Sequence, residues 1–220
     1  MTLQLYLASA SPRRSELLTQ LGIDHVVLNV PAVPGEDEPR HRNESPLAYV
    51  QRTAHDKADR CIEWVSTNAW HPDNQQAINE SPQGLKDDHR GLNQNLYALT
   101  ADTTVALGDR VLGKPVDQED ARKTLSLLSN QTHLVHTAVV LCRGQERLAA
   151  ISTSKVTFTA LSVQDIEQYI ASQEPFGKAG AYGIQGLAAQ YICKLEGSYT
   201  GVMGLPLFET AQLLKKAGIL

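Results

Sequence analysis

Short apolar segments typical of β-strands alternate along this chain with amphipathic segments typical of helices. The predicted strands cover residues 3–8, 26–30, 95–99, 103–107, 111–112, 133–142, 149–159 and 191–195. The predicted helices begin near Ser11, Ser45, Asp117, Ser162 and Pro206, residue types that favour a helix start. This alternation predicts an α/β fold in which helices flank a twisted sheet. Because long strands lie on both sides of Gly144, we expect a mixed sheet.

The composition is that of an ordinary globular protein, with 220 residues of which 42% are hydrophobic. A net charge of −4 argues against a broad nucleic-acid-binding surface. Cys61, Cys142 and Cys193 form no Cys-x-x-Cys pair, which favours a reducing cytoplasm over a disulfide framework. Neither a signal peptide nor a membrane-spanning stretch is recognisable. We therefore expect a single cytoplasmic domain, covering residues 1–220, that binds neither nucleic acid nor membranes.

One polar segment interrupts the alternation. Residues 66–95 are rich in Asn, Gln, Asp, His, Pro and Gly, a composition that buries little apolar surface. We interpret this segment as a mobile insertion. Trp64 and Trp70 leave open the alternative that it forms a functional lid.

The N-terminal strand turns at small residues into a helix that opens with two arginines. Ser11 is a good N-cap and Pro12 suits the first helical position. Cations in a first turn oppose the helix dipole, so Arg13 and Arg14 require compensation there. A polyphosphate would provide it, because backbone N–H groups, small hydroxyl residues such as Ser9 and two guanidinium groups all suit phosphate oxygens. The alternative is a surface helix whose arginines pair with carboxylates elsewhere.

Further charged residues lie near predicted strand ends and on the second predicted helix. Asp102 follows the strand at 95–99, at the position where open α/β sheets bind ligands. Asp102 and Glu38, which follows Asp37 in a Pro-rich loop, offer oxygen ligands to Mg²⁺. Lys57 and Lys114 offer point charges to a phosphate. Taken singly, each of these residues fits better as a solvated surface charge, because charged residues in loops are usually solvated.

Residues 177–186 contain four glycines spaced three apart, which allow positive φ angles and close backbone approach. Either a tight structural turn or a loop closed around a ligand would need such a segment. His133 and His136 suggest a metal pair, but three residues apart on a strand they point to opposite faces. We therefore do not predict a zinc site.

Together these motifs resemble one family, the Maf-type nucleoside triphosphate pyrophosphatases. The resemblance covers nearly the whole chain and rests on several ordered motifs. They are residues 9–14, 37–38, 54–58, 101–103, 113–115, 128–133, 178–186, 197–199 and 204–206. Three features depart from the family pattern: Thr100 and Asn130 each replace a glycine, and the segment at 66–95 is longer than usual. Thr100 puts the backbone geometry beside Asp102 in doubt, because a side chain now occupies a place where close approach is wanted.

The resemblance implies an elongated, two-lobed α/β fold with a central nucleotide cleft. It implies hydrolysis of a nucleotide to the monophosphate plus pyrophosphate, a divalent metal cofactor, Mg or Mn, and often a homodimer. Asp102 would be the proton acceptor, with Lys114 also assigned to the catalytic group. Ser9, Arg13, Arg14, Lys57, Thr103 and Gln185 would bind substrate, and Glu38 and Asp102 would hold the metal.

Substrate choice follows from three of these positions. A sister group directed at methylated GTP would have an aromatic residue, Gln and Glu at the positions of Arg13, Thr103 and Gln185. An amide offers both a donor and an acceptor, which suits the edge of uracil or thymine, whereas a carboxylate suits guanine. We therefore predict a dTTP and UTP pyrophosphatase. The alternatives are a nucleotide-binding regulator of cell division without turnover and a pyrophosphatase for modified nucleotides.

Overall fold

The computed structural model describes residues 5–31, 39–67 and 96–220. The strands are β1 (Leu5–Leu7), β2 (His25–Val27), β3 (Tyr97–Leu107), β4 (Arg110–Leu112), β5 (Thr132–Arg143), β6 (Glu146–Phe158) and β7 (Ile192–Glu196). The α-helices are α1 (Pro12–Gln20), α2 (Pro46–Thr67), α3 (Gln118–Leu128), α4 (Val163–Ala171), α5 (Tyr199–Met203) and α6 (Leu207–Lys216). Short 3-10 helices are η3 (Ala179–Ala181) and η4 (Leu187–Tyr191). Asp37, Glu38 and residues 68–95 of the predicted insertion lie outside the described residues, while residues 66 and 67 end α2.

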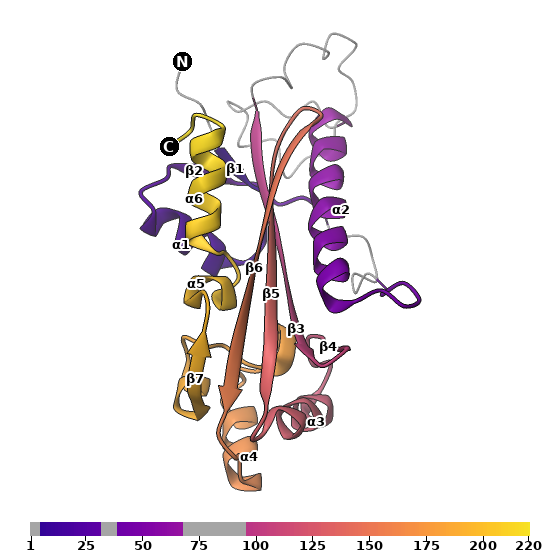
Figure 1. The fold of residues 1–220 in the computed structure, drawn as a ribbon, viewed down its shortest axis with the longest axis vertical. Coiled ribbons are helices and arrows are strands. Elements are labelled where there is room, and N and C mark those ends of the chain that lie inside the picture. Colours follow the sequence, from indigo (N-terminus) through magenta and orange to yellow (C-terminus); the bar gives the residue numbers. More distant parts are fainter. Residues whose placement is uncertain (1–4, 32–38, 68–95) are drawn as a thin grey trace.

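The strands form one seven-stranded sheet in the order β2-β1-β3-β5-β6-β7, with β4 paired to β3. β1 runs parallel to both β2 and β3, whereas the other pairs are antiparallel. The predicted α/β fold with a mixed sheet is therefore confirmed. The long hairpin of β5 and β6 extends along the longest axis of the molecule (Figure 1). Its turn contains Gly144, whose φ of 55° suits glycine.

Two predicted strands, 95–99 and 103–107, are in fact one. β3 pairs with β5 at every position from Tyr97 to Ala106, so the ladder continues through the polar residues between them. A run of threonines and an aspartate lowers the hydrophobicity that defines a strand in the sequence, but hydrogen bonding to β5 supports it. Asp102 consequently lies inside β3, and its predicted place at a strand end is wrong.

Helices cover the two faces of the sheet at one end of the molecule (Figure 1). Leu5, Leu7 and Leu99 pack with α1 and α6, whereas Tyr6 and Ala98 pack with α2 on the opposite face. This is the alternation expected of strands buried on both sides. At the other end, Val105, Val135 and Phe158 pack with α3, α4 and the η3–η4 segment. Asp102 and Thr103 lie on β3 between these two packed regions.

The starts of the helices follow the predicted capping chemistry with one exception. The Asp117 side chain caps α3, and Ser162 forms a capping box with Asp165 at α4. Ser11 occupies the N-cap position of α1, but its side chain makes no capping hydrogen bond. Asn130, which replaces a family glycine, has φ 56° and adopts the left-handed conformation that asparagine tolerates. Within the described parts of the chain, no helix is both long enough and apolar enough to cross a membrane.

Candidate active site

The free part of one edge of β3 defines the site. β1 pairs with residues 97–99 and β4 pairs with residues 105–107, while β5 covers the opposite edge. β1 and β4 therefore lie along the same edge and leave residues 100–104 between them unpaired on that side. The chain leaves the sheet at the carboxyl end of β1, where Ala8 N–H still donates to the Leu99 carbonyl at 2.9 Å. Open α/β sheets typically bind ligands at the carboxyl ends of their strands, and here the carboxyl end of β1 lies at this position.

α2 supplies two partners to the Asp102 carboxylate. Thr53 Oγ1 donates to Asp102 Oδ2 at 2.6 Å, and Lys57 Nζ forms an ion pair with Asp102 Oδ1. Thr53 and Lys57 are four residues apart and therefore share one face of the helix. The fully buried Ala54 and Ala58 let this face approach the sheet closely. The Asp102 side chain remains 16% exposed, so it is reachable from the cavity described below.

Thr100 contributes to the same contact between α2 and β3. Its buried hydroxyl donates to the Ala54 carbonyl at 3.2 Å. The side chain points toward α2 and away from the free edge, and β3 keeps its pairing with β5 at this position. The departure from glycine therefore leaves the strand intact beside Asp102, and the doubt about its geometry is removed.

Arg14 from α1 joins three segments around the site. Its Nε donates to the Gly204 carbonyl at 2.8 Å, Nη1 donates to Ser9 Oγ at 3.1 Å, and Nη2 donates to Thr103 Oγ1 at 3.4 Å. None of these partners is a carboxylate, so the alternative of a surface ion pair does not hold for Arg14. Burial lowers the pKa of Arg14, while the nearby Asp102 charge acts in the opposite direction. Two of the five guanidinium N–H groups are left for a ligand.

These residues surround a cavity of about 600 Å³. Eight of the nine predicted site residues line it: Ser9, Arg13, Arg14, Lys57, Asp102, Thr103, Lys114 and Gln185. The ninth, Glu38, lies outside the described residues. Residues separated by up to 176 positions in the sequence therefore meet at one place, as a shared binding site requires.

The cavity is strongly cationic. Its described lining contains six basic side chains, from Arg13, Arg14, Lys57, Arg60, Lys114 and Lys178, and a single carboxylate, that of Asp102. Within the described parts of the chain, Arg13 and Lys114 have no hydrogen-bond or ion-pair partner. A cluster of like charges is unfavourable unless an anion neutralises it, so this cavity suits a polyanion.

Lys178 is a lining residue that sequence reasoning missed. Burial lowers its pKa, and the neighbouring Arg13 adds to the decrease. The signal was its place in the glycine-rich segment, next to Gly177. Met203 was also missed, because α5 is too short to give a periodic pattern, whereas Gly204 lies in the motif at 204–206 without being predicted as a site residue.

The glycine-rich segment turns out to be both a structural turn and part of the cavity wall. Gly180 has φ 70°, and a Cβ there would lie 2.8 Å from Val105 Cγ1, so only glycine fits. Its N–H donates to the Gly113 carbonyl at 3.0 Å, which holds the segment against the end of β4. Gln185 is exposed and lines the cavity, and its amide has no hydrogen-bond partner within the described parts of the chain.

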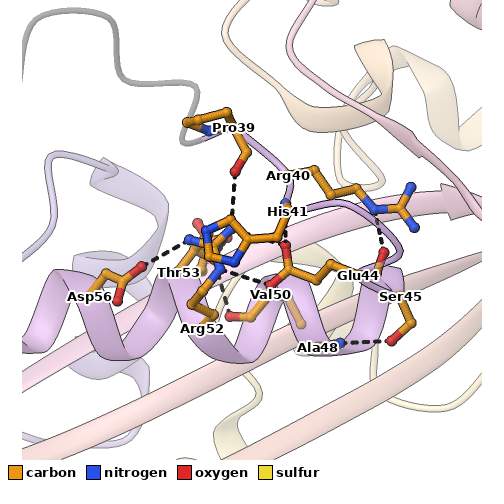
Figure 2. A network of polar contacts seen from close by, with 11 residues as sticks. Pro39, Arg40, His41, Glu44, Ser45, Ala48, Val50, Arg52, Thr53 and Asp56 are labelled. Atoms are coloured by element: carbon orange, nitrogen blue, oxygen red, sulfur yellow. Dashed lines mark hydrogen bonds and ion pairs between the residues drawn. The ribbon is translucent and has the colours of Figure 1, made fainter.

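A second polar network fixes the start of α2 (Figure 2). Arg52 donates from Nε to Glu44 Oε1 at 2.8 Å, from Nη1 to Asp56 Oδ2 at 3.0 Å and from Nη2 to the Pro39 carbonyl at 3.2 Å. The hydrogen bond from Arg52 lowers the pKa of Glu44 to about 2. This network attaches Pro39 and Glu44 to α2, the helix that carries Thr53 and Lys57.

A model of the family described as Maf-like protein matches residues 4–217. The chain belongs to this family. Among the relatives of this Maf-like protein is a dTTP/UTP pyrophosphatase of Bordetella parapertussis, 50% identical over 216 residues that cover 98% of this chain and 93% of the relative. A dTTP/UTP pyrophosphatase of Cupriavidus metallidurans is 46% identical over 223 residues, covering 100% of this chain and 99% of the relative. The family resemblance seen in the sequence is therefore confirmed.

The donor set of the Maf-like protein fits a divalent cation of the Mg type. Mg²⁺ is commonly bound by one or two carboxylates together with substrate phosphates, and Asp102 supplies one carboxylate beside the cationic cavity. Among the residues that the structure describes, no group of three or more His, Cys, Asp or Glu side chains is placed to hold a metal. A cation at Asp102 would therefore need further ligands from a bound molecule or from residues outside the described parts of the chain.

Proposed function

We propose that this protein hydrolyses dTTP and UTP to the nucleoside monophosphate and pyrophosphate. The observation that carries the proposal is the cavity in which one carboxylate, Asp102, faces six basic side chains. Such a site combines strong binding of a polyphosphate with one group able to accept a proton from water. Relatives that are up to 50% identical over nearly the whole chain are named dTTP/UTP pyrophosphatases, which supports the same substrate class.

The cations hold the triphosphate. Arg13, Lys57 and Lys114 lie around the cavity and provide donors to phosphate oxygens. Arg14 adds its two remaining N–H groups from a fixed position, because Gly204, Ser9 and Thr103 already orient its guanidinium. Positioning and charge neutralisation account for most of the catalysis of phosphoryl and nucleotidyl transfer, so a preorganised set of cations is the principal requirement.

Asp102 accepts the proton of the attacking water. Thr53 and Lys57 each donate to a different oxygen of its carboxylate, which leaves one lone pair on each oxygen for a further partner. The two α2 residues thus fix the orientation of the carboxylate without blocking it. The water attacks the α-phosphorus, the bond from this phosphorus to the oxygen that bridges to the β-phosphorus breaks, and pyrophosphate leaves with the bridging oxygen.

A divalent cation would be held by Asp102 and the phosphates, with Glu38 as a second protein ligand. When bound, the cation neutralises phosphate charge and increases the electrophilicity of the phosphorus.

Gln185 recognises the base. Its unpaired amide presents one acceptor and two donors to the cavity, which complements the N3–H and carbonyl edge of uracil and thymine. Thr103 Oγ1 accepts from Arg14 Nη2 and is hydrogen-bonded to Thr137 Oγ1, so Thr103 helps to hold the Arg14 guanidinium beside the cavity.

The proposal is tested by incubating the purified protein with a panel of nucleotides and Mg²⁺ or Mn²⁺ and identifying the products by chromatography. The panel contains dTTP, UTP, dCTP, dGTP, dATP, methylated GTP and 5-substituted UTP. Preferential conversion of dTTP and UTP to monophosphate and pyrophosphate supports it. Binding without turnover would instead favour a nucleotide-dependent regulator, and preference for a substituted nucleotide would favour a pyrophosphatase for modified nucleotides.

We also propose that the chain is a single cytoplasmic domain and that it forms a homodimer. For a single domain we expect one cooperative unfolding transition. For a cytoplasmic protein we expect recovery in the soluble cytoplasmic fraction of the cell. For a homodimer we expect a sedimentation mass twice that of the chain. A multiphasic transition, a membrane-associated fraction or a monomeric mass would each overturn the respective part.

A further inference from the structure

Gln185 lies in a loop whose backbone is held on both sides by one pair of residues. On its N-terminal side, Gly183 N–H donates to Tyr169 Oη at 3.2 Å. On its C-terminal side, Leu187 N–H donates to Glu174 Oε2 at 2.9 Å. Tyr169 O–H in turn donates to Glu174 Oε1 at 2.8 Å, which joins the two attachments. The loop that carries Gln185 is therefore attached to one carboxylate and one phenol.

The loop is packed closely around Glu174. A Cβ at Gly186 would lie 2.3 Å from Glu174 Oε1, so a side chain at this position would displace the Glu174 carboxylate from its contacts. Lys178 Nζ donates to the Glu174 carbonyl, and a Cβ at Gly183 would lie 3.1 Å from Lys178 Cε. The residues next to Gln185 are thus fixed, while its own side chain is exposed toward the cavity.

The Tyr169–Glu174 pair is itself held by further contacts. Tyr169 is 2% exposed, within the core formed by α3, α4 and the η3–η4 segment, and its ring makes an edge contact with Tyr191 at 6.1 Å between centroids. Ser172 Oγ donates to the Tyr169 carbonyl at 2.6 Å and accepts from Glu174 N–H at 3.2 Å. Burial and the neighbouring Glu174 raise the pKa of Tyr169, so the phenol keeps its proton as a donor.

We propose that Glu174 and Tyr169 are positioning residues for base recognition, which set the place of the Gln185 amide at the pyrimidine without touching substrate. Glu174 is absent from the described lining of the cavity, so it acts through the loop. The inference rests on the proposed function, in which Gln185 recognises the base. Selectivity for a base needs an amide held in place, because an amide that must be ordered on binding loses affinity to conformational entropy.

Glu174→Gln is the first test, because an amide can keep only one of the two acceptor contacts. Two substrates are compared: dTTP and an abasic deoxyribose triphosphate that retains the phosphates. We expect kcat/KM for dTTP to fall about tenfold, chiefly through KM, on the scale of one lost charge-assisted hydrogen bond. Hydrolysis of the abasic triphosphate should change less than twofold. Glu167→Gln is the matched control, since Glu167 on α4 pairs only with surface Arg122 and should leave both values unchanged.

A double-mutant cycle with Gln185→Ala separates positioning from general support of the fold. If Glu174 acts through Gln185, Glu174→Gln should have little further effect on dTTP hydrolysis once Gln185 is alanine. Full additivity of the two effects, or an equal loss on the abasic triphosphate, would overturn the proposal. Tyr169→Phe provides a second variant should Glu174→Gln fail to fold, and the same pattern is expected of it.

Amide hydrogen exchange without substrate keeps this inference separate from the proposed function. Exchange at residues 183–187 should accelerate in Glu174→Gln and not in Glu167→Gln. If the wild-type protein hydrolyses no pyrimidine triphosphate, the proposed function fails even where this exchange result holds. If dTTP is hydrolysed but exchange and selectivity are both unchanged in Glu174→Gln, the positioning role fails alone.

Discussion

Lys57 of α2 forms an ion pair with Asp102, which lies inside β3 and on the free part of its edge. This pair connects the helix that covers one face of the sheet to the only carboxylate among the described residues lining the cavity. Removing Asp102 leaves the Lys57 charge among the other cations that line the cavity. Removing Lys57 leaves the Asp102 carboxylate bonded to Thr53 but without its ion-pair partner. The ion pair therefore links the packing of α2 on the sheet to the position of the Asp102 carboxylate in the cavity.

Asp102→Asn should lower turnover by at least ~100-fold, the scale of a lost proton acceptor. The amide has nearly the same shape: its oxygen can still accept from Lys57, and its NH2 can donate to Thr53 Oγ1, whose own O–H can donate to the Val50 carbonyl, so the melting temperature should change by only a few degrees. Steady-state kinetics and thermal unfolding measure the two effects. Asp109→Asn, in the exposed turn between β3 and β4, is the matched control. Near-normal turnover in a folded Asp102→Asn protein would remove Asp102 from the mechanism.

Arg13→Ala and Arg14→Ala should behave differently. Arg13 lines the cavity without a hydrogen-bond partner among the described residues, so its loss should reduce kcat/KM and leave stability unchanged or slightly higher. Arg14 is bonded to Gly204, Ser9 and Thr103, and its loss should also destabilise the fold by about 1–3 kcal/mol. Thermal unfolding compares the two variants. An equal melting temperature for both would show that the Gly204 contact is dispensable.

This difference was not visible in the sequence, which treats the two adjacent arginines alike. From the helix dipole alone, replacing either arginine is predicted to leave stability unchanged or slightly raised, and for Arg14 this prediction conflicts with the hydrogen bond to Gly204. Gly204 is 190 positions away and follows a helix of five residues. No periodic pattern predicts such a short helix, so only the folded chain reveals the contact.

Other parts of the fold and the site follow from local sequence. The caps of α3 and α4, the left-handed Asn130 and the turn at Gly144 are determined by residue type, and all were predictable. The continuity of β3 was not, because it depends on pairing with β5 and not on the hydrophobicity of residues 100–104. Asp102 was selected as a site residue from its motif, although its place within the strand was wrong.

Gln185→Glu should change substrate preference. The carboxylate has nearly the shape of the amide but lacks a donor, so the carbonyl of a pyrimidine would face a negative charge at a cost of about 1–3 kcal/mol. We expect lower kcat/KM for dTTP and UTP and a relative gain for guanine nucleotides, measured on the same panel. Gln190→Glu, on the exposed side of η4, is the control. Equal losses for every nucleotide would place Gln185 at the phosphates.

His133 should make stability depend on pH. Burial beside Phe158 and Tyr182 lowers its pKa from 6.5 to about 4. Between these values the unfolded chain binds more protons than the folded one, so the free energy of unfolding falls as pH decreases from 6.5 to 4. The loss attributable to His133 is about 2–4 kcal/mol. Denaturant unfolding at several pH values should give a shallower slope for His133→Gln than for the wild-type protein; equal slopes for the two proteins would contradict this role.

Hydrolysis in ¹⁸O-labelled water tests the central claim most directly, because it identifies the phosphorus that water attacks. The site described above predicts that dTTP yields dTMP carrying one ¹⁸O atom and unlabelled pyrophosphate, as measured by mass spectrometry of both products. Label in the pyrophosphate, or release of labelled inorganic phosphate together with dTDP, would place the attack on the β- or γ-phosphorus and contradict the proposed role of Asp102.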